Sequence, residues 1–286
     1  MLVLIGYVVV LGSVFGGYAL MGGHFGALYQ PLELLMIGGA AFGAFLAGNN
    51  RKTILATVKE LLRVLRSSRH NKALYMDLLA LLFLLLAKGR KDGMLALESE
   101  IENPANSALF QQYPRIQDEP GVVDFLCDYL RVIISGNANP FEVEALMDHE
   151  IETYRHEASV PAQALARVGD ALPALGIVAA VLGVVNALAS ADQPPSVMGQ
   201  MIAHAMVGTF LGVLLAYGFI TPLSSLIEQK LAESAKMYEA IKVTLLASLN
   251  GYAPQLAVEF GRKVLYSTER PSFGELDAHV REVKAR

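Results

Sequence analysis

The sequence predicts an all-α, polytopic membrane protein with four transmembrane helices and a cytoplasmic helical domain. Of its 286 residues 53% are hydrophobic and only 17% are charged, whereas soluble domains carry about 25% charged residues. All 23 lysines and arginines lie within residues 51–167 and 230–286, which leaves two long blocks without a cation. A net charge of −4 without a basic stripe interleaved with aromatic residues argues against binding of nucleic acid.

Each cation-free block is long enough for two membrane spans of roughly 20 residues. The spans are expected at residues 2–21 and 34–50, and at 171–191 and 198–227. The first is interpreted as a retained span, because it lacks the basic start and the cleavage site of a signal peptide. The apolar segment 73–87 is too short to cross a ~30 Å hydrocarbon core and is expected to be a buried cytoplasmic helix.

The distribution of cations also predicts the orientation. Lysines and arginines crowd the chain after the second and fourth spans, while the loops 22–30 and 191–198 contain none. Because cations mark cytoplasmic loops, both termini are expected in the cytoplasm. Four segments follow: a transmembrane hairpin at 1–50, a cytoplasmic helical domain at 51–168, a second hairpin at 169–227, and a cytoplasmic extension and tail at 228–286.

Helical periodicity indicates the cytoplasmic elements. Helices are expected over 52–68, 122–134 and 141–158, and the fourth span should continue as a helix to Leu249. Pro161 is expected to break or kink the chain before the third span. The polar residues from Pro271 onward are expected to be loosely ordered.

Small residues recur four apart in every span, a spacing that lets helices approach closely. Two interpretations stay open: packing within the chain, or contacts between subunits of an assembly. The pairs are Gly12/Gly16, Gly39/Gly43, Ala179/Gly183 and Gly208/Gly212.

The sequence shows no catalytic or metal-binding motif. Cys127 is the only cysteine, which excludes a disulfide within the chain, and it is expected to pack a helix face. The pairs His149-Glu150 and His156-Glu157 do not form a zinc-protease motif. We therefore predict no enzymatic activity, no catalytic residue, no metal site and no cofactor.

Ionisable groups within spans usually mark an ion route. Glu33 and His204 are expected toward the outside and Asp170 toward the cytoplasm, which leaves the middle of the membrane without a titratable group. A partner should therefore supply the group that carries charge across.

Counting residues along the two antiparallel spans predicts which positions face this partner. Ala180 and Thr209 should meet at mid-depth, and Pro173 and Pro222 near the cytoplasmic boundary. A proline removes a backbone donor and kinks its helix, so two at matched depth favour a hinge.

Several segments resemble the MotA family of flagellar motor stator subunits. LPALGIVAAVLGVV at 172–185 and VGTFLGVLLAYGFITPL at 207–223 resemble its third and fourth spans, which the wider TolQ/ExbB group shares. YALMGGHFGALYQPLELLMIGG at 18–39 and KGRKDGMLALESEIENP at 88–104 resemble the stator family specifically.

The resemblance implies a homo-oligomeric ring in the bacterial inner membrane around a MotB-type subunit. The single span of that partner carries an ion-binding aspartate, and its outer part binds peptidoglycan. Ion flow then drives rotation against the rotor switch protein FliG. Arg90, Glu98 and Glu150 match the charged positions that contact FliG, the first two being about 12 Å apart if they share one helix. Thr209 matches the hydroxyl on the ion path, and Pro173 and Pro222 match the prolines that couple ion binding to motion.

Protons are the expected ion, because sodium-driven relatives carry a threonine where this chain has Ala180. Two alternatives remain: a sodium-driven stator, or a TolQ/ExbB-type proton channel subunit that energises an outer-membrane system. Secondary transport is disfavoured by the apolar midplane, and a scaffold without ion flux would tolerate substitution of Thr209 and Pro173.

Overall fold

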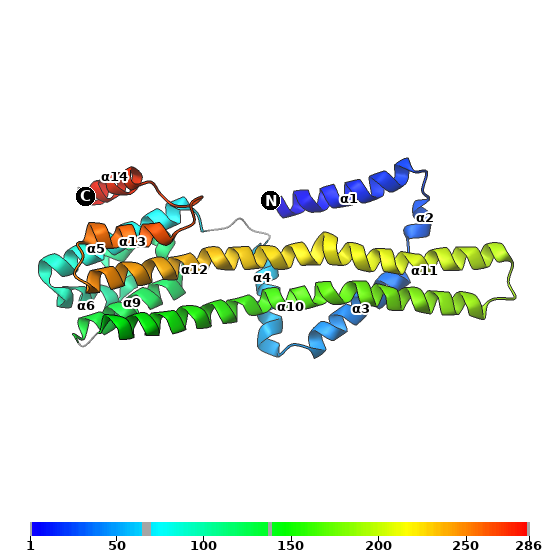
Figure 1. Cartoon of the computed structure of the whole chain (residues 1–286), viewed down its shortest axis with the longest axis horizontal. Helices are drawn as coiled ribbons and strands as arrows, with labels where there is room; N and C mark the ends of the chain where they lie inside the picture. The colour runs from blue at the N-terminus through cyan, green and yellow to red at the C-terminus, as the bar shows by residue number, and fades with distance from the viewer. Residues whose placement is uncertain (1, 65–69, 137–138, 285–286) are drawn as a thin grey trace. The chain divides into compact units, whose positions relative to one another are not determined.

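The computed structural model describes residues 2–64, 70–136 and 139–284, and in these ranges the regular elements are all helical (Figure 1). Four apolar stretches are long enough to span a membrane: Leu2–Leu20, Phe25–Ala47, and parts of Pro140–Ala189 and Pro195–Leu249. The predicted fold class is confirmed. The last residues of the helix expected over 52–68 lie outside the described residues.

The chain divides into two compact units, one formed by residues 1–67 and 158–229 and the other by residues 68–157 and 230–286. Two long helices, α10 (Pro140–Ala189) and α12 (Thr221–Leu249), contribute residues to both. This division follows packing, whereas the four segments expected from the sequence follow membrane topology, so those segments stay a prediction.

The first unit contains the apolar helices. They are α1 (Leu2–Leu20), the short α2 (Phe25–Leu28), α3 (Pro31–Ala47), the later part of α10, α11 (Pro195–Leu215), the π-helical segment η3 (Ala216–Ile220) and the start of α12. The unit also contains α4 (Arg51–Val64), which carries several charged residues. Helix α1 has a mean hydropathy of 2.0 and no buried residue, as expected for a helix whose surroundings are lipid or other spans.

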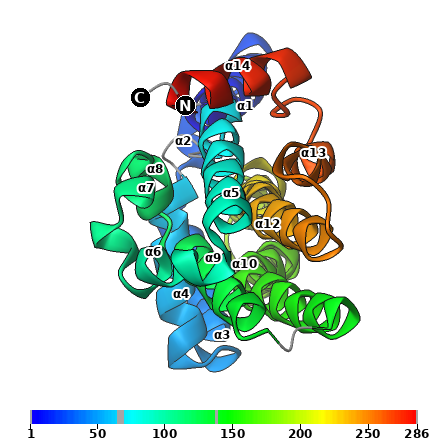
Figure 2. The ribbon, with the colours of Figure 1, turned by 90° about the vertical axis from the view of Figure 1, so that its left-hand side faces the viewer.

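The second unit has a core built around α5 (Lys72–Asp92). Its side chains Leu78, Leu79, Leu81 and Leu82 are completely buried, which confirms that the apolar segment 73–87 is a core helix. Figure 2 shows α5 surrounded by helices of this unit. The others are η1 (Met94–Leu97), α6 (Glu98–Glu102), η2 (Pro104–Asn106), α7 (Ala108–Gln111), α8 (Pro114–Gln117), α9 (Pro120–Ile134), α13 (Pro254–Val264), α14 (Phe273–Lys284), and the parts of α10 and α12 beyond the first unit.

Two expectations about order along the chain need correction. Helix α10 runs through Pro161, so the expected break is wrong, whereas a kink at this proline stays a prediction. The residues after Pro271 form α14, which buries Leu276 and Val280 against the core, and Lys72 binds Glu275 at 2.7 Å. Two apolar residues one helical turn apart are enough to dock this otherwise polar segment.

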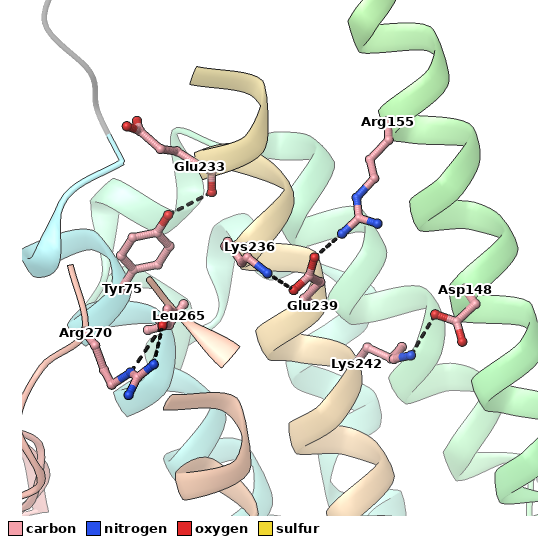
Figure 3. Close-up of polar contacts among 9 residues, drawn as sticks. All are labelled: Tyr75, Asp148, Arg155, Glu233, Lys236, Glu239, Lys242, Leu265 and Arg270. Carbon is pink, nitrogen blue, oxygen red and sulfur yellow. Dashed lines mark hydrogen bonds and ion pairs between the residues drawn. The ribbon is translucent and has the colours of Figure 1, made fainter. Parts of the chain in front are cut away.

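Polar contacts join α10 to α12 within the second unit (Figure 3). Arg155 on α10 and Lys236 on α12 both bind Glu239, and Lys242 binds Asp148 at 2.7 Å. The contacts lie along facing sides of the two helices, so they fix which faces are turned toward each other.

Candidate functional site

Glycines set the packing of α10 against α11. A Cβ atom on Gly212 would lie 2.6 Å from the Leu172 carbonyl oxygen and 2.9 Å from Gly176 Cα, and one on Gly183 would lie 2.6 Å from Ala205 Cβ. Such distances are well below the contact distance of about 3.5–4.0 Å between carbon atoms. The backbones therefore touch only because side chains are missing there.

This packing decides one question that the small-residue pairs left open. The pairs Ala179/Gly183 and Gly208/Gly212 serve contacts within the chain. In contrast, Gly12, Gly16, Gly39 and Gly43 have no described heavy atom within 4 Å of an added Cβ.

The register brings the two mid-span positions together. A Cβ on Gly208 would lie 3.2 Å from Ala179 Cβ and 3.3 Å from the Ala180 backbone nitrogen. Thr209 follows Gly208 directly, so Ala180 and Thr209 lie at the same level of the helix pair, as predicted, and both are half-buried. Their roles in an ion path stay predictions.

The two prolines do not lie directly opposite each other. Pro173 is half-buried inside α10, while Pro222 is exposed and follows the π-helical segment. A Cβ on Gly169 would lie 3.0 Å from Thr221 Oγ1. The start of α12 is therefore opposite Gly169, which lies about one turn before Pro173 on α10. This offset follows from the residue count, because thirteen residues separate Thr209 from Pro222 but only seven separate Ala180 from Pro173.

The position of Glu33 differs from the expectation. Its side chain is 7% exposed, and its Oε2 lies 3.2 Å from where a Cβ on Gly208 would be. The carboxyl group therefore lies at the level of Ala180 and Thr209, and the expectation that no titratable group reaches mid-span is wrong. Although Glu33 lies in the first turn of α3, this turn packs against the middle of α11.

Glu33 is the polar member of a buried stripe on α3, with Ile37 and Ala41 one and two turns further along. This i, i+4, i+8 spacing is the sequence signal that could have placed it in the interior. The Oε2 atom is buried and has no hydrogen-bond partner among the described residues.

The three predicted rotor-contact residues all lie in the second unit and are exposed. Arg90 is in the last turn of α5, but Glu98 begins α6, so the two do not share one helix as the 12 Å spacing assumed. Gly93, with φ of +90°, ends α5 between them. That left-handed conformation favours glycine.

The surroundings of these residues differ. Arg90 lines a cavity of about 260 Å³ whose other lining residues are Phe83, Ala87, Lys91, Pro254 and Gln255. Glu150 on α10 accepts a hydrogen bond of 2.7 Å from the Tyr129 hydroxyl. Burial, together with this bond, raises the pKa of Tyr129.

Neither the cysteine nor any acidic cluster offers a metal site in the described part of the chain. Cys127 is buried within the α5-centred core, where burial raises the pKa of its thiol to about 12. Among the described residues, no three His, Cys, Asp or Glu side chains are placed to hold a metal ion.

Comparison with known proteins assigns this arrangement to a class. The Motility protein A N-terminal family model matches residues 4–93, and the MotA/TolQ/ExbB proton channel family model matches residues 121–240. A chain whose described residues form only helices, four of them of span length, and which has these matches is a multi-pass membrane protein of the channel-subunit class, which is not a class of enzymes.

The relatives are more specific. Motility protein A of Salmonella typhimurium and that of Escherichia coli are each 62% identical over 284 residues, which covers 99% of this chain and 96% of theirs. Chemotaxis protein LafT of Vibrio parahaemolyticus is 33% identical over 278 residues, 97% of this chain and 98% of its own. The chain belongs to the Motility protein A family, as the sequence motifs predicted.

Solved structures have the same fold. The structure of Campylobacter jejuni MotAB matches with a TM-score of 0.77 at 22% identity, covering 94% of this chain and 98% of that one. The flagellar MotAB stator complex of Bacillus subtilis matches with a TM-score of 0.69 at 24% identity, covering 90% and 92%.

Proposed function

We propose that the chain is the ring-forming subunit of a flagellar stator that couples inward proton flow across the bacterial inner membrane to torque on the rotor protein FliG. The observation that carries this proposal is the 62% identity to Motility protein A over nearly the whole chain. It covers both span hairpins and the segment with Arg90 and Glu98. The match to the N-terminal family model favours a stator over a TolQ/ExbB-type energiser.

The partner in this proposal is a MotB-type single-span subunit that binds peptidoglycan, with several copies of this chain around it. Relatives in the solved structures are MotAB complexes, which supports such an assembly. Open space at Gly12, Gly16, Gly39 and Gly43 leaves small-residue faces on α1 and α3 available to neighbouring spans. The long polar segments and both termini would face the cytoplasm, following the positive-inside rule.

Protons are the proposed ion because of the chemistry at Ala180. A bare sodium ion needs several oxygen ligands, whereas a proton needs one carboxylate or a water chain. At the level where α10 and α11 touch, Ala180 adds a methyl group instead of a second hydroxyl, so the side-chain oxygen atoms there belong to Thr209 and to the carboxyl group of Glu33. The missing hydroxyl favours proton transfer through the carboxylate of the partner over sodium binding.

The proposed cycle is a charge-driven switch. Protonation of the partner's carboxyl removes a charge near Thr209 and Ala180, and this changes which packing of α10 and α11 is stable. Pro173 and Pro222 each leave a backbone carbonyl without its helical partner, so bending at these points is easier than elsewhere. Residues of α10 and α12 extend beyond both prolines into the unit that carries Arg90, Glu98 and Glu150.

Torque would come from the exposed charges of the second unit. No ion pair of Arg90 or Glu98 occurs among the described residues, so both can meet opposite charges on the rotor. Glu150 keeps an exposed carboxylate although Tyr129 binds one of its oxygen atoms.

Complementation tests the function and the ion together. A bacterial strain that lacks its motA gene is supplied with this chain and placed in sodium-free medium. We expect swimming that stops when a protonophore collapses the proton gradient. Motility that requires sodium would support the sodium-driven alternative. Cells that do not swim in medium with or without sodium would be the result expected for a TolQ/ExbB-type subunit.

A further inference from the structure

The span core contains one carboxyl group that the proposed mechanism does not use. Glu33 is 7% exposed, and its Oε2 has no hydrogen-bond partner in the described chain. An ionised carboxylate in an apolar interior costs far more than the neutral acid unless it is paired. An intramembrane ionisable residue of this kind is a candidate functional site.

The spans contain no lysine or arginine side chain that could neutralise the charge of Glu33. Lysine and arginine are absent from residues 1–50 and 169–229, which contain α1, α3, the spanning part of α10, α11 and η3. Proton uptake is therefore the way in which this carboxyl group becomes neutral within the chain.

The titratable groups of the packed helices are few. On α11, His204 lies one turn before Gly208 and is half-buried. On α10, Asp170 is exposed and ten residues from Ala180, about 15 Å along the helix. The other titratable groups on these elements are tyrosines: Tyr7, Tyr18 and Tyr217.

Gly208 makes the room in which the Glu33 carboxyl group lies. A Cβ at position 208 would be 3.2 Å from Glu33 Oε2, and on its other sides it would meet Ala179 and Ala180. The carboxyl group thus reaches the contact between α10 and α11 next to Thr209, and the residues Ile37 and Ala41 hold α3 there.

We infer that Glu33 is an accessory proton-binding residue of the ion path. Its carboxylate takes a proton that enters from the outer side, becomes the neutral acid at the level of Gly208 and Thr209, and releases that proton toward the carboxyl group of the partner span. This inference rests on the proposed function.

The test compares Glu33→Gln with Glu33→Asp in motor complexes that contain the partner subunit. Glutamine keeps the size and polarity of the side chain but cannot titrate, whereas aspartate keeps the carboxyl group. Glu228→Gln, an exposed acid at the start of α12, is the matched control. Torque is measured between external pH 5.5 and 8.5, and membrane levels of each variant are measured alongside.

We expect the pH at which torque falls to half to shift by about one unit in Glu33→Gln, a tenfold change in proton concentration, and to return toward the unsubstituted value in Glu33→Asp. Glu228→Gln should leave the curve unchanged. A Glu33→Gln curve that coincides with that of the unsubstituted chain would overturn the inference while leaving the proposed function intact. If the unsubstituted chain produced no proton-driven torque, the proposed function itself would fail.

Infrared difference spectroscopy of the purified complex covers the case in which Glu33→Gln assembles poorly. We expect a carboxyl band that titrates with pH and shifts in Glu33→Asp. The absence of any titrating band that responds to the aspartate substitution would show that Glu33 only packs α3 against α11.

Discussion

Replacing Gly212 by alanine tests the close pairing of α10 and α11 on which the candidate ion path depends. The added Cβ would lie 2.6 Å from the Leu172 carbonyl oxygen and 2.9 Å from Gly176 Cα, both of which are backbone atoms that no rotamer change can move. The helices would have to separate by several tenths of an ångström or more. Overpacking of this kind costs about 1–3 kcal/mol.

The assay is thermal unfolding of the purified chain in detergent, followed by motility of complemented cells. For a chain of this size, a loss of about 1–3 kcal/mol corresponds to a fall in the midpoint of roughly 2–12 °C. Gly199→Ala on the same helix is the control, because no heavy atom lies within 4 Å of its added Cβ. If Gly212→Ala and Gly199→Ala unfolded at the same temperature, the backbone contact would not exist.

Three further outcomes are expected. Arg90→Glu should lower torque roughly fivefold, as expected for a loss of about 1 kcal/mol of charge complementarity, without lowering the amount of the protein in the membrane. Lys59→Glu on α4 is the control, and normal swimming of cells with Arg90→Glu would refute the rotor contact. Hydrogen bonds from Lys72 and Ser272 lower the pKa of Glu275 to about 2. The stability that the ionised carboxylate adds to the docking of α14 is therefore present above the ordinary glutamate pKa and is lost as pH falls toward 2. Limited proteolysis should therefore cut α14 faster as pH falls through that window, and Glu275→Gln should remove this dependence. Because burial raises the pKa of Cys127 to about 12, iodoacetamide should not modify it at pH 8 until the chain unfolds; rapid reaction with the folded chain would contradict its burial.

The four spans, the buried helix α5 and the register of Ala180 with Thr209 were all predictable from the sequence. Each depends on a property that does not change with tertiary packing: the cost of a charge in lipid, the length needed to cross a bilayer, and a rise of 1.5 Å per helical residue. The family also followed from local motifs. These features do not require knowledge of which helix packs against which.

Other features depended on the packing of distant segments. Helix α14 forms because Leu276 and Val280 pack against the α5-centred core, and residues Ala216–Ile220 form a π-helical turn that the sequence pattern does not indicate. Gly93 separates Arg90 from Glu98, which residue spacing alone would place on one helix.

Glu33 shows the difference most clearly. The sequence by itself determined that a carboxyl group lies next to the start of the second span without any cation nearby. Only the tertiary structure decided that the first turn of α3 packs against Gly208 in the middle of α11, because depth in a helix bundle is set by contacts between helices and not by the position at which each helix begins.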